Sequence, residues 1–223
     1  MKITSSLLAL AAASGLTLAS PMAVADGHVS ESPPFWTYPT LPPEGSTRLV
    51  RSPNGLTAQF QTTGLAAGHA VTLWIMFFDN PEACQNDICD PAVDIGMPGV
   101  RFDFHYAGGH IVNGKKTTLT GHLQTGETST SGWAELAAIG GAPPFFITPL
   151  TNPEGAQVIL ALHSHGPAQT GQTLKEQMSS YLGGCVLPFL GDAAGFAQSA
   201  DDIPAEDGEC STIQVAFHIP SAD

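Results

Sequence analysis

The feature that most constrains the fold is the recurrence of short segments in which apolar and polar residues alternate, separated by turns rich in glycine and proline. Residues 56–61 (LTAQFQ) alternate in this way, which predicts a strand buried on one face. Residues 69–79 (HAVTLWIMFFD) are apolar on both faces, a pattern typical of a central strand that is covered on both sides. Further strands are predicted at residues 101–106, 116–123, 157–165 and 211–219.

Composition agrees with a chain made of strands. The 223 residues include 24 Gly and 18 Pro, and 12% are charged, about half of the usual quarter. A fold rich in helices is disfavoured, because the exposed faces of many helices would need more charged residues than this chain has. One short helix is predicted over residues 173–182, ended by Gly183 and Gly184, and residues 134–155 are predicted to form a long Gly/Pro loop. The expected fold is all-β, an antiparallel β-sandwich or barrel.

Two local patterns give finer predictions. The Asn113-Gly114 pair is a turn signal, and it predicts a hairpin between residues 110–112 and 116–123. In the last strand, alternation predicts one buried apolar face and one polar face. The apolar face comprises Ile213, Val215, Phe217 and Ile219, and the polar face Thr212, Gln214 and His218.

The N-terminus predicts an exported protein. Lys2 is followed by an apolar stretch over residues 7–19 and by Ala23-Val24-Ala25, the small-x-small form of a cleavage site. That stretch is shorter than the roughly 20 residues of a spanning helix. We therefore expect a signal peptide at residues 1–25, an arm rich in Pro and aromatic residues at 26–47, and a single β-sandwich domain at 48–223. Both the periplasm and the extracellular medium fit this pattern.

The four cysteines predict disulfides. An even number of cysteines in an exported chain indicates two bonds with three alternative pairings. The spacing within PEACQNDICD suggests that Cys84 pairs with Cys89, which leaves Cys185 to pair with Cys210. A thiolate metal site is the alternative, but the chain has no CxxC pair.

Charge and motifs narrow the classes of function. A formal net charge of -13 disfavours a nucleic acid partner, and no segment after the signal peptide is long and apolar enough to span a membrane. The chain contains no nucleophile elbow, no phosphate-binding loop and no HExxH motif. A protein or glycan partner is left open. Trp36 and Trp133 are candidates for an exposed sugar-stacking surface, whereas Trp74 is expected in the core.

Histidines are the candidate metal ligands. Because side chains alternate across a strand, His163 and His165 project from the same side of their predicted strand, as two ligands of one copper or zinc ion would. If neighbouring strands bring further imidazoles to this pair, the set is completed from His105, His110 and His122. The alternative is structural, because histidines at strand ends often form hydrogen bonds with turn carbonyls.

Two segments resemble the CHRD (chordin-type) domain. They are GLAAGHAVTL at residues 64–73 and HSHGPAQTG at residues 163–171. The resemblance implies an exported β-sandwich, a module often likened to copper/zinc superoxide dismutase and usually without assigned activity. In that family the two phrases are nearly contiguous, whereas here they are far apart in the sequence. The whole chain also resembles uncharacterised exported bacterial proteins.

The leading hypothesis from the sequence is an exported β-sandwich that acts as a binding or interaction module. The first alternative is a copper- or zinc-binding protein that uses the histidines around His163 and His165. The second alternative is a secreted enzyme without a recognised motif.

Overall fold

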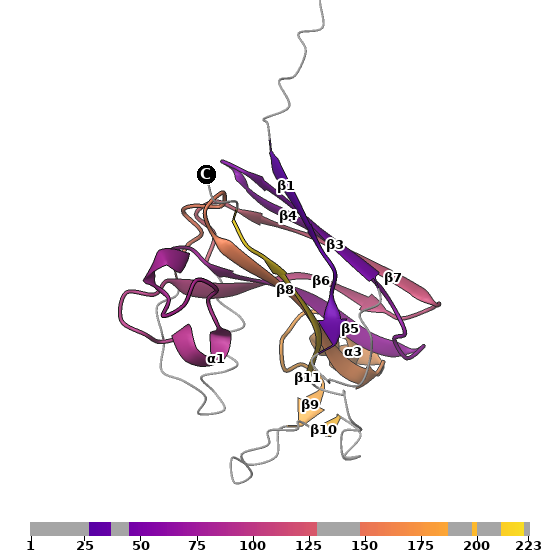
Figure 1. Ribbon diagram of the computed structural model, residues 1–223. Helices are drawn as coiled ribbons and strands as arrows, with labels where there is room; N and C mark the ends of the chain where they lie inside the picture. Colours follow the sequence, from indigo (N-terminus) through magenta and orange to yellow (C-terminus); the bar gives the residue numbers. More distant parts are fainter. Residues whose placement is uncertain (1–26, 37–44, 129–147, 187–197, 200–210, 221–223) are drawn as a thin grey trace, which may run out of the picture.

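Two antiparallel sheets pack face to face in the computed structural model, which describes residues 27–36, 45–128, 148–186, 198–199 and 211–220 (Figure 1). The first sheet has the order β1-β3-β4-β7, with β1 (His28–Ser32), β3 (Gly45–Ser52), β4 (Gly55–Thr63) and β7 (Lys116–Gln124). The second has the order β2-β11-β8-β5-β6, with β2 (Phe35–Trp36), β11 (Ser211–His218), β8 (Gln157–Pro167), β5 (His69–Phe78) and β6 (Phe102–Ile111). The all-β prediction is therefore confirmed as a sandwich, and the two sheets are not joined into a barrel.

Smaller elements lie outside the two sheets. They are the 3-10 helix η1 (Pro81–Ala83), the helices α1 (Pro91–Asp94) and α3 (Gly171–Gln177), and a ribbon formed by β9 (Cys185–Val186) and β10 (Gln198–Ser199). Within the described residues, no helix has both the length and the apolar character needed to cross a membrane.

The main core lies between the two sheets. The first sheet contributes one face of alternating residues, among them the buried Leu56 and Phe60, and the second contributes Leu73 and Leu160. Burying such side chains is the main stabilising term for a sandwich of this kind.

A second apolar cluster covers the outer face of the second sheet. Trp74 and Phe104 lie at its centre, and Val100 and Tyr181 pack on them from segments outside the sheet. Strands β5 and β8 are consequently covered on both faces, which confirms the prediction made for residues 69–79. Trp74 has no exposed surface, as expected of a core residue.

The structure adds two strands that were not predicted, and one prediction of strand pairing was wrong. The N-terminal arm contains two strands, because β1 pairs with β3 and β2 pairs with β11. Pro33 and Pro34 lie between them, and since proline has no backbone N–H to donate, the chain leaves one sheet there and enters the other. The predicted hairpin at Asn113-Gly114 does not form, because β6 and β7 belong to different sheets. Val112 explains the difference: its N–H donates to the His69 carbonyl, and its carbonyl accepts from the Gly68 N–H.

Two predictions needed smaller corrections. The predicted helix is shorter, ending at Gln177, and the Ser179 and Ser180 hydroxyls donate to the carbonyls of Lys175 and Glu176 just beyond. In β11 a bulge between Thr212 and Gln214 changes the alternation. As a result, two residues assigned to the polar face, Gln214 and His218, are buried, while Ile219 is 39% exposed.

Candidate functional site

The first candidate site is the loop closed by the disulfide bond between Cys84 and Cys89, which confirms this predicted pair. The loop lies against the start of β8, where the side-chain amide of the buried Gln157 holds it. Gln157 Oε1 accepts from the Cys89 N–H at 2.8 Å, and Gln157 Nε2 donates to the Cys89 carbonyl at 2.8 Å. One side chain thus satisfies both backbone groups of a loop residue, much as a neighbouring strand would.

Asp94 fixes the rest of this loop from α1. Its buried carboxylate accepts from the Gln85 N–H at 2.9 Å and from the Asp90 N–H at 2.7 Å. The carboxylate lies within 4.8 Å of both cysteine sulfurs. Because the sulfurs are bonded to each other and both carboxylate oxygens accept backbone hydrogens, the grouping is accounted for by its role in stabilising the loop.

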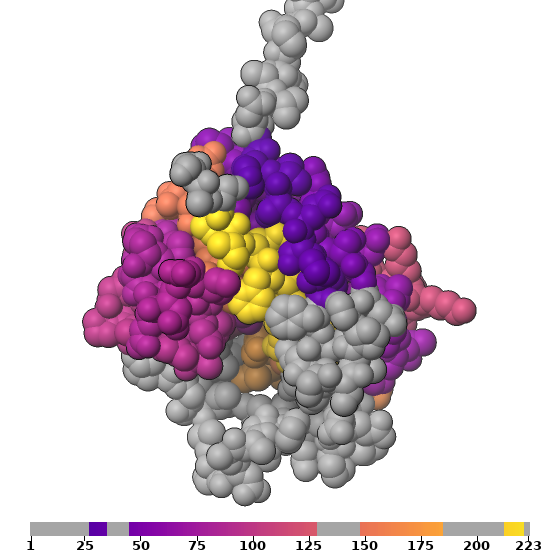
Figure 2. All heavy atoms as spheres, viewed as in Figure 1, coloured from indigo at the N-terminus to yellow at the C-terminus, as the bar shows by residue number. Residues whose placement is uncertain are grey.

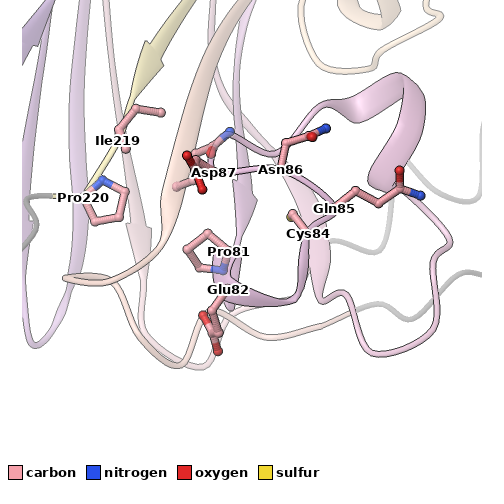
Figure 3. A pocket seen from close by; sticks show the side chains of 9 residues that line it. Pro81, Glu82, Cys84, Gln85, Asn86, Asp87, Ile219 and Pro220 are labelled. Atoms are coloured by element: carbon pink, nitrogen blue, oxygen red, sulfur yellow. The ribbon is translucent and has the colours of Figure 1, made fainter.

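A depression of about 350 Å³ lies between this loop and the end of β11. Its lining comprises Pro81, Glu82, Cys84, Gln85, Asn86, Asp87, Gln157, Ile219 and Pro220, and we call it the disulfide-loop depression. Figure 3 shows Ile219 and Pro220 lying across from Pro81 and Asp87. Two carboxylates, those of Glu82 and Asp87, line it without any Lys or Arg. Ile88, next to the lining, is 52% exposed.

The second candidate site is the histidine pair on the outer face of β8. The rings of His163 and His165 are buried side by side, with centroids 4.8 Å apart, so the spacing of two does place both on one side of the strand. The Tyr181 ring packs on His163, with centroids 4.4 Å apart. Its hydroxyl lies 3.0 Å from the Thr212 hydroxyl on β11.

Hydrogen bonds define the tautomer of His165. Its Nδ1 lies 2.9 Å from the Gly183 carbonyl, which only accepts, so Nδ1 carries the hydrogen. Its Nε2 lies 2.8 Å from the Thr72 hydroxyl, which in turn accepts from Trp74 Nε1–H at 2.9 Å. Nε2 therefore presents a lone pair. Burial lowers the pKa of His165 to about 4, against the hydrogen bond to Gly183, which raises it, so the ring is neutral near neutral pH.

His163 differs from His165 in having no hydrogen bond. Both of its ring nitrogens lack a partner in the described part of the chain, although only 2% of the residue is exposed. Burial, reinforced by His165, lowers the pKa of His163 well below its ordinary value, so this imidazole is also neutral.

The other three predicted ligands lie elsewhere. His105 is opposite Ile75 in register and so faces the space between the sheets, where its Nε2 is 3.3 Å from Asp103 Oδ2. His110 is opposite Val71 on the same strand. His122 is exposed on β7, with Nδ1 3.0 Å from the Thr57 hydroxyl. The structure thus brings His163 and His165 together and leaves these three apart from them.

Several predictions fall on residues outside the described ranges. Cys210, Trp133 and the signal peptide at residues 1–25 are among them, so the Cys185–Cys210 bond and export remain predictions. Two functional residues had no signal in the sequence: Gln157, which begins a strand, and Tyr181, which follows a helix. Gln157 forms hydrogen bonds with the Cys89 backbone and Tyr181 packs on His163, and both contacts join segments that are distant in the chain.

No match emerged when the chain was compared with models of protein families, with curated proteins and with solved structures. Residues 64–73 and 163–171, which are far apart in the sequence, are neighbours in the second sheet. Residues 69–73 pair with residues 162–167 across β5 and β8, and the Ala168 N–H donates to the Gly68 carbonyl at 2.9 Å.

Proposed function

We propose that this chain is an exported β-sandwich that binds a partner protein at the disulfide-loop depression. The observation that carries the proposal is the open depression beside a loop that is fixed in place by a disulfide and by Gln157. Export itself is supported by the pattern of residues 1–25. A binding module was also the leading hypothesis from the sequence.

Rigidity favours binding at this place. A loop that is already ordered loses little conformational entropy when a partner docks, so more of the contact energy appears as affinity. The disulfide, the Gln157 amide and the Asp94 carboxylate all act on the ten residues from 81 to 90. In Figure 2 the surface of this region, in magenta, lies directly beside the yellow surface of β11.

The lining of the depression and the adjacent Ile88 define the chemistry of the partner. Ile88 and Ile219 are exposed, and apolar side chains at the centre of an interface carry much of its binding energy. Glu82 and Asp87 add negative charge without a neighbouring cation in the lining. A partner segment that presents an apolar side chain next to Arg or Lys would complement both features.

The test is a selection from a displayed peptide library against the full-length chain, followed by affinity measurements on the selected peptides. We expect peptides with an apolar residue beside a basic one. Ile88→Ser and Ile219→Ser should each weaken their binding by about tenfold. Val29→Ser is the matched control, because Val29 is a similarly exposed apolar residue, 42% against 52% for Ile88, on the edge strand β1.

Two results would contradict the proposal. One is that the selected peptides lose as much affinity for the Val29→Ser variant as for the Ile88→Ser variant. The other is recognition of immobilised glycans by the wild-type chain and by both isoleucine variants alike, which would place binding on another surface and make the ligand a sugar.

A further inference from the structure

Among the described residues, the buried imidazole of His163 is a feature that the fold leaves unexplained. Buried polar side chains in folded proteins almost always have hydrogen-bond partners, because an unpartnered one costs folding free energy. Both nitrogens of His163 lack one within the described residues. An apolar side chain would fill the same place without that cost. The imidazole is therefore best explained by a ligand that needs a nitrogen lone pair.

His165 is oriented as a metal ligand usually is. Ligating histidines commonly donate one ring N–H to a backbone carbonyl, which fixes the ring and leaves the other nitrogen for the metal. His165 does so through Nδ1 and the Gly183 carbonyl at 2.9 Å. Its Nε2 now accepts from the Thr72 hydroxyl, and that hydroxyl can rotate away when a metal binds.

One ion can reach both rings. Bonds from a metal to an imidazole nitrogen are about 2 Å long, and the two ring centroids are 4.8 Å apart. Small rotations of the side chains would bring one nitrogen of each ring to a common point.

The surroundings determine which ion fits. Tyr181 packs on His163 and Trp74 packs on Tyr181, so the pair has an aromatic cover. In the described residues neither histidine belongs to a cluster of three or more His, Cys, Asp or Glu side chains. Within that part of the chain the pair therefore has no carboxylate or thiolate as a third ligand.

An enclosed site that has no anionic ligand among the described residues disfavours a doubly charged ion, because an uncompensated charge in an apolar environment is costly and the cost rises steeply with charge. Zinc is always divalent, whereas copper also exists as the monovalent, softer ion, and imidazole binds copper well. We propose that His163 and His165 form a binding site for Cu(I). This site is separate from the disulfide-loop depression and does not depend on the function proposed there.

The segment after α3 closes the site. A Cβ on Gly183 would lie 2.0 Å from the Glu176 carbonyl oxygen, so only glycine lets this segment approach α3 so closely. That approach is what directs the Gly183 carbonyl at His165. Tyr106 secures the same segment by donating its hydroxyl to the Met178 carbonyl.

The experiment is an anaerobic titration of the full-length chain with Cu(I), in competition with a chromogenic Cu(I) chelator. Wild type should take up one equivalent in competition, and His163→Leu should bind at least about a hundredfold more weakly, because it removes a ligand. His122→Gln is the matched control: His122 is a strand histidine on β7 with one hydroxyl partner, and its loss should leave the affinity unchanged.

Loss of Cu(I) binding in His163→Leu would not result from misfolding, because the variant should fold as well as wild type. Because it removes an unpartnered polar group from an apolar site, the metal-free variant should unfold at a temperature no lower than wild type. Added Cu(I) should raise the unfolding temperature of wild type and of His122→Gln, but not of His163→Leu. Peptide binding at the disulfide-loop depression should be the same in all three, which separates the two proposals.

Any of three outcomes would overturn the inference. If His163→Leu competes for Cu(I) as well as wild type does, the ion binds elsewhere. If wild type binds Co(II) or Zn(II) more tightly than Cu(I), the argument from the charge of the site is wrong. Failure of wild type to take any Cu(I) from the chelator would leave His163 as a buried imidazole without a ligand.

Discussion

A Cβ on Gly121 would lie 2.3 Å from the Cβ of Ala107, so the two sheets meet at a corner where only glycine fits. Gly121 is on β7 and Ala107 on β6, the edge strands that the sequence predicted to be a hairpin. The strands do touch, but through side-chain contact between sheets and not through a ladder of hydrogen bonds.

Gly121→Ala should therefore destabilise the protein by about 2–3 kcal/mol, because the added methyl group forces the corner apart. Urea denaturation followed by fluorescence measures the free energy of unfolding. Gly114→Ala is the control, since a Cβ there meets no heavy atom within 4 Å. Ala107→Gly should restore part of the loss in the double variant. Equal destabilisation by both single glycine substitutions would refute this account of the corner.

His218 should make the protein less stable in mild acid. The ring is buried with its Nε2 2.9 Å from the Thr47 hydroxyl and its Nδ1 2.9 Å from the Ser30 hydroxyl. The Thr47 hydroxyl donates to the Ser32 carbonyl, so it accepts from Nε2–H and the neutral ring is satisfied. Burial, and next the charge of Arg51, lower the pKa of His218 from 6.5 to about 4.

Because the folded state resists protonation of His218, its stability is complete above pH 6.5 and falls as the pH drops from 6.5 towards 4. His218→Gln keeps both hydrogen bonds without titrating. Relative to wild type, we expect this variant to gain about 2–3 kcal/mol between pH 7 and pH 4.5. Urea denaturation at the two pH values gives the comparison. A difference between variant and wild type that does not change with pH would show that His218 is protonated as easily when folded as when unfolded.

Gln157→Leu should loosen the disulfide loop. The substitution keeps the size of the side chain but leaves the Cys89 N–H and carbonyl without their partners, at a cost of about 2–4 kcal/mol. Hydrogen exchange at Cys89 should accelerate along with the loss of stability. Gln59→Leu, at an exposed position of β4, is the matched control and should change neither quantity by much. Unchanged exchange at Cys89 in Gln157→Leu would mean that the amide is dispensable.

Removing the disulfide by a double Cys84→Ser, Cys89→Ser substitution should cost about 2 kcal/mol, the amount expected for closing so small a loop. The effect should be local, because Asp94 and Gln157 still hold the loop backbone. Proteolysis between residues 84 and 89 should become faster while the unfolding transition stays cooperative. Loss of the cooperative transition would show that the bond is essential for folding.

The sequence predicts the strands better than their partners. The sequence identifies β4 by the alternation of apolar and polar residues, because one face of this strand is buried. It identifies β5 and β8 by their apolar runs, because both faces of these strands are buried. The turn signal at Asn113-Gly114 is equally local, but it does not specify the sheet that the next strand joins. That choice is made by Val112, through hydrogen bonds to residues 68 and 69.

Part of the candidate sites could also be predicted. The spacing of two predicted that His163 and His165 lie on the same side of their strand, and the short spacing of Cys84 and Cys89 predicted their disulfide bond. Tyr181 and Gln157 could not be found in this way, because each acts on residues far away in the chain. The burial of His218 could not be predicted from the sequence either. The bulge in β11 adds one residue, and this reverses which of the following side chains face inward.

The position of β8 determines how the chain must fold. This strand lies between β5, which precedes it, and β11, which comes near the C-terminus, and it pairs with both (Figure 1). Pairings between segments so distant in sequence are slow to form, since each requires a long loop to close first. A chain whose synthesis stops before residue 211 would leave the N–H and C=O groups along one edge of β8 without their partners, and such an edge can pair with other chains. The second sheet can therefore be completed only after residues 211–218 have been synthesised.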